Sequence, residues 1–468
     1  MAKTSKSSTK SAPNSDVFLL KNEKKHFRNI LIKNKLKRHL KSRRNDFSIS
    51  PAYFFTVKNQ IDHFRIDRKN ELFVLFLLRN GGNAMKICGI IVEYNPFHNG
   101  HRYHAEMARE QTGADIVIAV MSGNFLQRGE PAIIDKWSRA TAALQNGVDL
   151  VIELPIEWSV QSADYFAKGA VRLLQMLGCT HLCFGTEEES TFNYEAFGKF
   201  VQQNQLRIDR EFQRLSDQGM SYPQKMTAVF NTLYPEIALD FSSPNHILGL
   251  SYAKENAQYA QPMKLVPITR KSAGYHDEEW SSSSIASATA IRKALSEQRS
   301  VTDFIPAATA AMIEAGSQQT WANYWPLLRY RLLSTELANL KTIYQMTEGL
   351  EVRMQSAAKK ATSFEEFVTL VKTKRYTWTR IQRLACYVLL NIHHEEIHDQ
   401  QAKCYLNILG FTKAGQQFLK EKKEIPLISK IGKKEAELAH LLVRSDQIYQ
   451  LGGAIPEQNF GRRPYVSK

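Results

Sequence analysis

The feature that most constrains the fold is a regular alternation of short apolar runs and amphipathic segments, which begins at Met85. Strand-like apolar runs cover 86–94, 114–123, 148–155 and 179–185, and helical patterns between them cover about 100–112, 135–146 and 163–178. Continuous apolar runs of this length are typical of strands that are covered on both faces. Their alternation with helices predicts an α/β fold with a Rossmann-like, doubly wound parallel sheet.

The pattern changes along the rest of the chain. Helical patterns cover 191–235, 244–257 and 287–295, and 262–270 has the pattern of another strand. From about residue 300 the strand pattern disappears and helical spacing continues. We therefore place a domain boundary near 296–310, with a catalytic α/β domain over 85–300 and a mainly α-helical C-terminal domain over 301–468.

The positive charge is concentrated at the start of the chain. The whole chain of 468 residues carries a net charge of +16, of which residues 1–84 hold 19 Lys and Arg against 6 Asp and Glu. This segment could be a basic arm for nucleic acid. We favour a disordered extension or a miscalled start, because the Gly81-Gly82 codons can form a bacterial ribosome-binding sequence just upstream of Met85.

The number of cysteines and the length of the apolar runs indicate where in the cell the protein is expected. The chain has five scattered cysteines and no apolar run near the length of a membrane span. An odd, sparse set of cysteines in a long chain favours a reducing compartment over a disulfide framework. We therefore expect a cytoplasmic protein.

The motif NPFHNGH (95–101) follows the first predicted strand. His98, His101 and His104 share the spacing of a zinc-binding helix face, but no nearby cysteine or carboxylate completes such a site, so we expect no metal site. A strand-to-helix junction suits phosphate better, because a helix N-terminus offers free N–H groups and a positive dipole. Gly100 would allow close approach of the backbone, and both histidines can donate to phosphate oxygens.

A second motif strengthens the nucleotide interpretation. HxGH alone is a weak signal, but Ile285 to Arg292, with the sequence IASATAIR, matches the ISxTxxR pattern of nucleotidyltransferases. On its own this stretch could be an ordinary capped helix, since Ser and Thr favour the N-cap. The two motifs together, in this order, predict a nucleotidyltransferase-like domain.

The sequence then resembles one family closely. The stretches VEYNPFHNGHRYH, SGNFLQRGEPAIIDKWSRA, GVDLVIELP, FGTEE, SPNHILGL, TRKSAGYHD and SATAIRKAL occur in that order. Together they resemble the bacterial tRNA(Met) cytidine acetate ligases. The resemblance covers about 85–468 and is densest over 85–295; residues 1–84 have no counterpart in the family pattern.

The resemblance implies a two-step reaction. Acetate and ATP, with Mg²⁺ as the usual companion of ATP, would give acetyl-adenylate and pyrophosphate. The acetyl group would then pass to N4 of the wobble cytidine of elongator tRNA(Met), giving N4-acetylcytidine. The C-terminal domain over 301–468 would bind the tRNA.

The resemblance also implies the site residues. It assigns to ATP binding Ile91, Val92, Glu93, Tyr94, Asn95, Pro96, Phe97, His98, Asn99, Gly100, His101, Arg102, Tyr103, His104, Gly185, Asn245 and Arg270. We assign His98, His101 and Arg292 to catalysis, because adenylation needs alignment of the acetate oxygen with the α-phosphorus and stabilisation of charge. Asn245 could instead cap a helix.

Other polar residues leave alternatives open. Asp135 could cap a helix, and Arg139 could contact ligand or RNA. Residues 127–130 (Gln-Arg-Gly-Glu) suit a mobile lid or an RNA contact. The basic, aromatic stretch 372–383 suits RNA, with Lys374, Arg375, Arg380 and Arg383 as candidates, or it is a solvated helix face.

Two rival functions share these motifs. An adenylyltransferase acting on a phosphorylated coenzyme precursor would use the same phosphate motifs, but it would not need some 170 further residues of helical chain. A non-catalytic RNA-binding protein could retain an ancestral nucleotide fold, but His98, Gly100, His101 and Arg292 are all intact.

Overall fold

The computed structural model describes residues 85–187, 192–215, 220, 222–235, 244–270, 285–347, 349–422 and 424–467. Met85–Lys468 form one compact unit, and residues 1–84 lie outside the described residues together with the predictions made for them. Most of the TRKSAGYHD stretch also lies outside them. In the described part of the chain, no helix is both long and apolar enough to cross a lipid bilayer.

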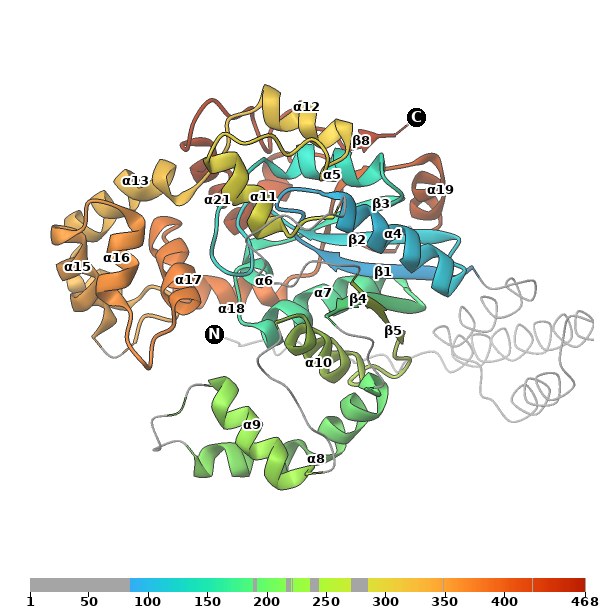
Figure 1. Cartoon of the computed structure of the whole chain (residues 1–468), viewed down its shortest axis with the longest axis horizontal. Helices are drawn as coiled ribbons and strands as arrows, with labels where there is room; N and C mark the ends of the chain where they lie inside the picture. The colour runs from blue at the N-terminus through green and yellow to red at the C-terminus, as the bar shows by residue number, and fades with distance from the viewer. Residues whose placement is uncertain are drawn as a thin grey trace, which may run out of the picture. The chain divides into compact units, whose positions relative to one another are not determined.

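The unit from Met85 is built on one mixed sheet with helices on both faces (Figure 1). Among the described strands, β1 to β5 run parallel in the order β5-β4-β1-β2-β3. Their bounds are β1 Ile87–Val92, β2 Ile116–Ser122, β3 Leu150–Leu154, β4 His181–Thr186 and β5 Lys264–Thr269. The predicted doubly wound α/β fold is confirmed. The strand order reverses between β1 and β4, and such sheets bind ligands beyond the strand ends at this point.

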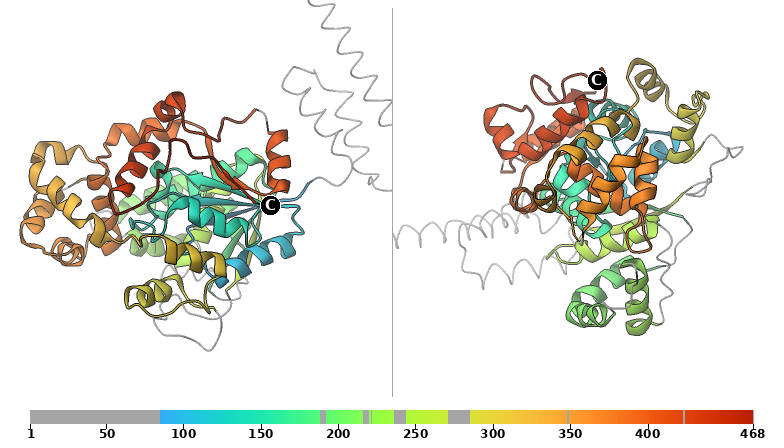
Figure 2. Two further views of the ribbon diagram at one scale, coloured as in Figure 1. Left: turned by 90° about the horizontal axis from the view of Figure 1, so that it is seen from above. Right: turned by 90° about the vertical axis from the view of Figure 1, so that its left-hand side faces the viewer.

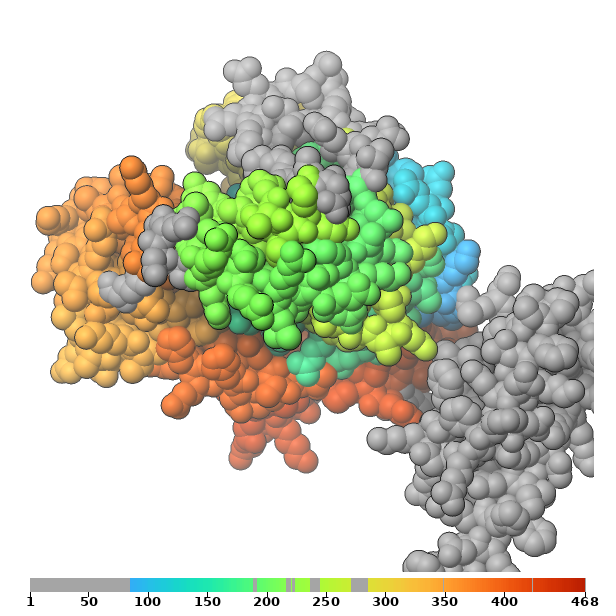
Figure 3. Space-filling model, turned by 90° about the horizontal axis from the view of Figure 1, so that it is seen from below, coloured from blue at the N-terminus to red at the C-terminus, as the bar shows by residue number. Residues whose placement is uncertain are grey.

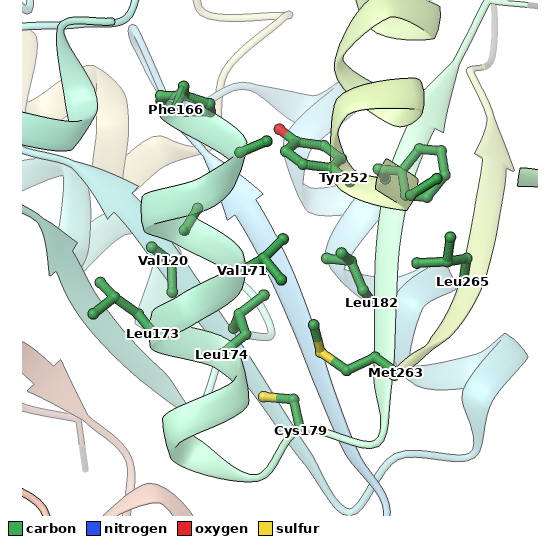
Figure 4. Close-up of a cluster of buried hydrophobic side chains, with 14 of the residues drawn as sticks. Val120, Phe166, Val171, Leu173, Leu174, Cys179, Leu182, Tyr252, Met263 and Leu265 are labelled. Carbon is green, nitrogen blue, oxygen red and sulfur yellow. The ribbon is translucent and has the colours of Figure 1, made fainter. Parts of the chain in front are cut away.

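The strands are apolar on both faces because helices cover both. In β2, Ile118 and Val120 face one buried cluster, whereas Val117 and Ala119 face another, as the period of two in a strand requires. Figure 4 shows the first cluster, in which Val171 and Leu174 lie near Val120 and Leu182. Its side chains come from the sheet and from the helices below it in Figure 1.

The helices of the α/β part lie close to the predicted ranges, with one further short helix over 156–159 that was not predicted. They are α4 Asn99–Thr112, α5 Lys136–Leu144, α6 Ile156–Ser159, α7 Ala163–Leu177, α8 Tyr194–Arg214, α9 Tyr222–Leu233, α10 Pro244–Asn256 and α11 Ala288–Ser296. Helices α4 and α5 cover one face of the sheet, and α7 and α10 cover the other (Figure 1). Helices α8 and α9, in green, form much of the surface seen from below in Figure 3.

The C-terminal part is mainly helical, as predicted. Its helices are α12 Ala307–Ala315, α13 Trp321–Ser334, α14 Leu337–Lys341, α15 Leu350–Lys360, α16 Phe364–Val371, α17 Trp378–Leu389, α18 His394–Ala402, α19 Lys413–Glu421, α20 Lys433–Leu438 and α21 His440–Gln450. Helices α13 to α17 gather at one end of the unit (Figures 1 and 2) around a separate apolar core.

The expectation that strands end near residue 300 is wrong. The chain returns to the sheet through β6 Leu406–Phe411, which pairs antiparallel with β3. Two short strands, β7 Leu427–Ile428 and β8 Tyr465–Val466, pair with β6. The apolar run of β6 is isolated between helices, so its local pattern does not show which strand it pairs with. It pairs with the edge of β3 that lies opposite β2.

A buried ion cluster ties this returning segment to the α/β part. Lys136 Nζ lies 2.7 Å from Glu153 Oε2 and 2.5 Å from Asp446 Oδ2, and the three side chains are 3% exposed or less. Asn407 donates to Glu153, and Asn124 donates to Asp446. One ammonium thus joins α5, β3 and α21. Burial raises the pKa of Asp446 to about 7, although Lys136 opposes this shift.

Candidate active site

A cavity of about 570 Å³ opens beyond the carboxyl ends of β1, β4 and β5, where the strand order reverses. The predicted site residues that line it are Ile91, Val92, Glu93, Tyr94, Asn95, His98, Gly100, His101, Tyr103, His104, Gly185, Asn245, Arg270, Arg292 and Arg383. Both phosphate motifs therefore open onto one space, because β1, α4 and α11 all end or begin at this edge of the sheet.

His98 and His101 hold the start of α4. Gly100 N donates to His98 Nδ1 at 3.1 Å, and His98 N donates to His101 Nδ1 at 3.3 Å, which forms a capping box. The two rings stack with centroids 3.7 Å apart. Since each Nδ1 accepts a backbone hydrogen bond, the neutral ring carries its proton on Nε2. Both histidines are thus fixed as Nε2–H donors.

The two histidines of the motif and His104 have pKa values below the physiological range, so they are neutral at pH 7. Burial, and then the charges of Arg270 and Arg292, lower the pKa of His98 to about 3. Burial and Arg270 lower the pKa of His104 to about 4, and burial, His98 and Arg270 hold the pKa of His101 well below its usual value. Neutral imidazoles can donate hydrogen bonds but carry no charge. The arginines would therefore balance the negative charge of a phosphate.

Two arginines provide that charge. Arg292 Nη1 donates to the carbonyl of Asn95 at 2.9 Å, which joins α11 to the HxGH loop. Ser287 caps α11 by accepting from Ala290 N, so the helix N-terminus also faces the cavity. The side chain of Arg270 makes no hydrogen bond or ion pair within the described residues. These cations and the two helix N-termini form an anion site.

Tyr94 is held in a strained conformation at the end of β1. Its φ is 55°, a left-handed value that is unusual for a bulky side chain. Its buried hydroxyl has no hydrogen-bond partner within the described residues, and the same holds for His104 Nε2. Both residues line the cavity. Strain and unpaired polar atoms of this kind concentrate where a ligand binds.

Asn245 and Gly185 lie at the β4 side of the cavity. Asn245 Nδ2 donates to Glu187 Oε1 at 2.6 Å, and no side-chain cap of α10 by Asn245 is formed within the described residues. A Cβ on Gly185 would make only an ordinary contact with Arg270, at 3.5 Å. Both residues line the cavity, and the side chain of Asn245 is already held by Glu187.

Some predicted residues do not line the cavity. In the described structure, Pro96, Phe97, Asn99 and Arg102 lie outside it, although they belong to the same loop and helix. Phe97 is buried under α4, and Arg102 pairs with Glu106 at the surface. Three of the four RNA candidates, Lys374, Arg375 and Arg380, also lie outside the cavity.

Arg139 does not meet a ligand, which settles one of the open alternatives. It is fully buried and donates to the carbonyls of Glu93, Ser122, Gly123 and Ile134. It thereby fixes the ends of β1 and β2. Asp135 is the cap of α5, since it accepts from Trp137 N and Ser138 N.

The segment 127–130 packs against the helical part of the chain. Gly129 has a φ of 79°, and its carbonyl accepts from the Trp321 indole at 2.9 Å. A Cβ on Gly129 would lie 2.5 Å from Arg383 N and 2.6 Å from Gln382 C, both in α17. This contact brings α17 to the rim of the cavity, where Thr379 and Arg383 line it.

Replacing Gly129 with alanine should therefore displace α17 from the cavity. We expect a loss of about 1–3 kcal/mol in the free energy of unfolding. Gly349→Ala is a matched control, because Gly349 has a φ of 75° but nothing within 4 Å of an added Cβ. Equal destabilisation of the two variants in urea unfolding would show that backbone strain alone is responsible.

The remaining lining was not predicted. Ala163, Phe166, Ile247, Leu248, Tyr252 and Thr379 supply parts of the wall. Most belong to the apolar faces of α7 and α10, where a core position and a cavity-wall position have the same local pattern. No sequence signal separates the two.

Comparison with known proteins decides the family. The model of the HIGH Nucleotidyl Transferase family matches residues 85–462. The tRNA(Met) cytidine acetate ligase of Latilactobacillus sakei subsp. sakei (strain 23K) is 43% identical over 390 residues, which cover 81% of this chain and 97% of the relative. The chain belongs to this ligase family.

Other ligases of the family agree. The tRNA(Met) cytidine acetate ligase of Halalkalibacterium halodurans is 43% identical over 378 residues, covering 77% of this chain and 91% of the relative. The structure of apo Thermotoga maritima TmcAL has a TM-score of 0.75 at 30% identity and covers 82% of this chain and 99% of that one. TmcAL bound with α-thio ATP has a TM-score of 0.73, also at 30% identity. The family resemblance seen in the motifs is confirmed.

Proposed function

We propose that this protein joins acetate to N4 of the wobble cytidine of elongator tRNA(Met), using ATP. One observation carries the proposal: the two phosphate motifs meet in one cavity of a chain whose relatives, over nearly their full length, are tRNA(Met) cytidine acetate ligases. The scattered cysteines and a tRNA substrate support a cytoplasmic location.

The first step forms acetyl-adenylate. A carboxylate oxygen of acetate attacks the α-phosphorus of ATP, and pyrophosphate leaves with the electron pair of the broken P–O bond. His98 and His101 donate through Nε2 to the phosphates, while Arg270 and Arg292 balance the charge that develops. Preorganisation supports this assignment, because hydrogen bonds to backbone groups already orient both imidazoles and Arg292.

The second step needs the anticodon loop at the cavity. We assign tRNA binding to the helical part beyond residue 300, with Arg383 at the cavity rim. Lys374 and Arg375 are exposed in the turn before α17, and the Arg380 guanidinium lies 4.8 Å from the Tyr376 ring centroid. A wobble base is single-stranded, so it can leave the loop and enter a pocket.

The coenzyme adenylyltransferase alternative is not favoured. The phosphate-binding residues suit both reactions, but the relatives that match over nearly their whole length are acetate ligases. Thr379 and Arg383 of α17 also line the cavity, so the helical part forms part of its wall. A single-domain adenylyltransferase has no need of such a contribution.

Pyrophosphate release tests the function directly. The protein, ATP and acetate should release pyrophosphate in proportion to acetate, and adding elongator tRNA(Met) should give acetylated cytidine that nucleoside mass spectrometry detects. Propionate and formate serve as matched carboxylates. Release that does not depend on acetate, with no acetylated nucleoside, would overturn the proposal.

The double variant Lys374→Ala/Arg375→Ala tests the RNA surface. Losing two phosphate contacts should weaken tRNA binding by about tenfold at moderate salt and reduce the slope of log Kd against log salt by about 2. The matched control is Lys433→Ala/Lys434→Ala, which removes two exposed charges from α20. An equal effect in both would mean that net charge, and not this surface, binds the tRNA.

A further inference from the structure

The cavity has two halves with different chemistry. The nucleotide half is formed by the ends of β1, β4 and β5 and by the N-termini of α4 and α11. The other half is formed by Glu93, by Gln127, Arg128 and Glu130 from the segment after β2, and by Thr379 and Arg383 from α17. This second half includes residues of α17, which belongs to the helical part of the chain, and only Arg292 of the phosphate motifs contacts it, through Glu130.

Two carboxylates in this half are unexpected in a pocket for a polyanion, because they repel phosphate. Glu130 Oε2 lies 3.8 Å from Arg292 and is partly neutralised by it. Glu93 has no ion pair within the described residues. Its Oε1 accepts from Gln127 N at 2.7 Å, and its Oε2 has no hydrogen-bond partner among the described residues.

The surroundings of Glu93 suit a proton acceptor. Burial raises the pKa of its carboxyl, Glu130 raises it further, and Gln127 N, Arg128 and Arg139 oppose the shift; the Tyr252 phenol is the other titratable group near it. A carboxylate with a raised pKa is a stronger base than an exposed one, and it remains able to ionise. The hydrogen bond from Gln127 N orients the group and leaves the second oxygen for a ligand.

Arg383, which lines the same cavity, offers the complementary chemistry. Its Nε is buried without a hydrogen-bond partner in the described part of the chain. Its backbone is held by the close packing of Gly129 against α17. The second half thus pairs an unsatisfied acceptor with an unsatisfied donor. The Watson–Crick edge of cytosine has the matching order, with a donating N4 amine beside the accepting N3 and O2.

We propose that the half of the cavity between Glu93 and Arg383 is the subsite for the acceptor base, and that Glu93 takes the proton from its attacking exocyclic amine. This inference rests on the proposed function. The amine lone pair forms the N–C bond to the acetyl carbon. The bond from that carbon to the adenylate oxygen breaks, and AMP leaves with its electron pair. One N4 proton passes to Glu93 Oε2, so the product keeps the other as an amide N–H.

Glu93→Gln tests the assignment by separating the two steps. The variant keeps an oxygen for Gln127 N but cannot take a proton. Single-turnover acetyl transfer to tRNA should fall by about 100-fold or more, and by at least about tenfold more than acetate-dependent pyrophosphate release without tRNA, which reports any part that Glu93 has in ATP binding. The rise of the wild-type transfer rate with pH should also disappear. Glu110→Gln, on the exposed end of α4, is the matched control.

The other outcomes are distinct. If both steps fall together and added Mg²⁺ restores them, Glu93 binds the cation of ATP and the assignment is wrong. Unchanged transfer in Glu93→Gln also overturns it. Absence of acetate-dependent pyrophosphate release in the wild type overturns the proposed function itself.

Arg383→Gln provides a second, independent test. It should raise the KM for tRNA by about tenfold or more, with a much smaller effect on pyrophosphate release without tRNA. Melting temperatures of both variants show whether they fold. An unchanged KM for tRNA in a folded Arg383→Gln variant would show that Arg383 does not contact the base. The base orientation proposed from its donor would then also be wrong.

Discussion

His101→Ala should slow acetate-dependent pyrophosphate release by about 10²–10³-fold, the usual cost of losing one preorganised donor to a charged transition state. His101 is fixed for this purpose, since its Nδ1 accepts from His98 N and its ring stacks on His98. The loss should appear mainly in kcat, because the arginines still bind the phosphates of ATP. Initial rates of pyrophosphate release at saturating ATP and acetate measure it.

Two controls separate chemistry from helix capping. His101→Ala also removes part of the capping box of α4, which costs about 1 kcal/mol of stability and lowers the melting temperature by a few degrees. His398→Ala, an exposed position on α18, should change neither the rate nor the melting temperature. Full activity in a folded His101→Ala variant would remove this residue from the catalytic assignment.

Lys136→Met should destabilise the protein by about 3–5 kcal/mol, the cost of leaving buried charge unpaired. Without the ammonium, Glu153 and Asp446 would face each other in a space where the side chains are 3% exposed or less. Methionine preserves most of the volume, so the effect reports charge and not a cavity. Urea unfolding followed by circular dichroism measures it.

A compensated variant makes this prediction specific. Lys136→Met combined with Glu153→Gln and Asp446→Asn removes all the charges of the cluster and should recover a large part of the loss, because neutral amides can bond to each other. Lys341→Met is the matched control, since its ion pair with Glu351 is 3.8 Å long and Lys341 is exposed. A triple variant as unstable as Lys136→Met would mean that packing and not unpaired charge is responsible.

The elements of the α/β part follow from local patterns. Strands β1, β2, β3 and β5 lie within their predicted ranges, β4 ends one residue beyond its range, and α4 and α11 begin within one residue of their predicted starts. Periodicity and capping act over a few residues, so they can be read from a single stretch of chain. The cap formed by Asp135 and the position of His98 at a helix N-terminus also depend only on neighbouring residues, so the sequence predicts them.

Local patterns do not predict which distant segments pair, as strand β6 shows. Its apolar run is visible, but its pairing with β3 joins residues more than 250 positions apart. The same holds for Asp446 beside Lys136 and for Arg139, whose carbonyl partners lie at the ends of two different strands. A basic residue at a helix start looks the same in the sequence whether it faces a ligand or the core.

By itself, the sequence therefore determined the fold class, the position of both phosphate motifs at strand-to-helix junctions, and the family, because these depend on short-range spacing. Only the tertiary structure decided that Arg139 is structural, that residues 127–130 are packed against α17, and that Glu93 faces a second half of the cavity completed by Arg383. These facts depend on contacts across hundreds of residues, and burial, which sets the charge state of each group, exists only once those contacts have formed.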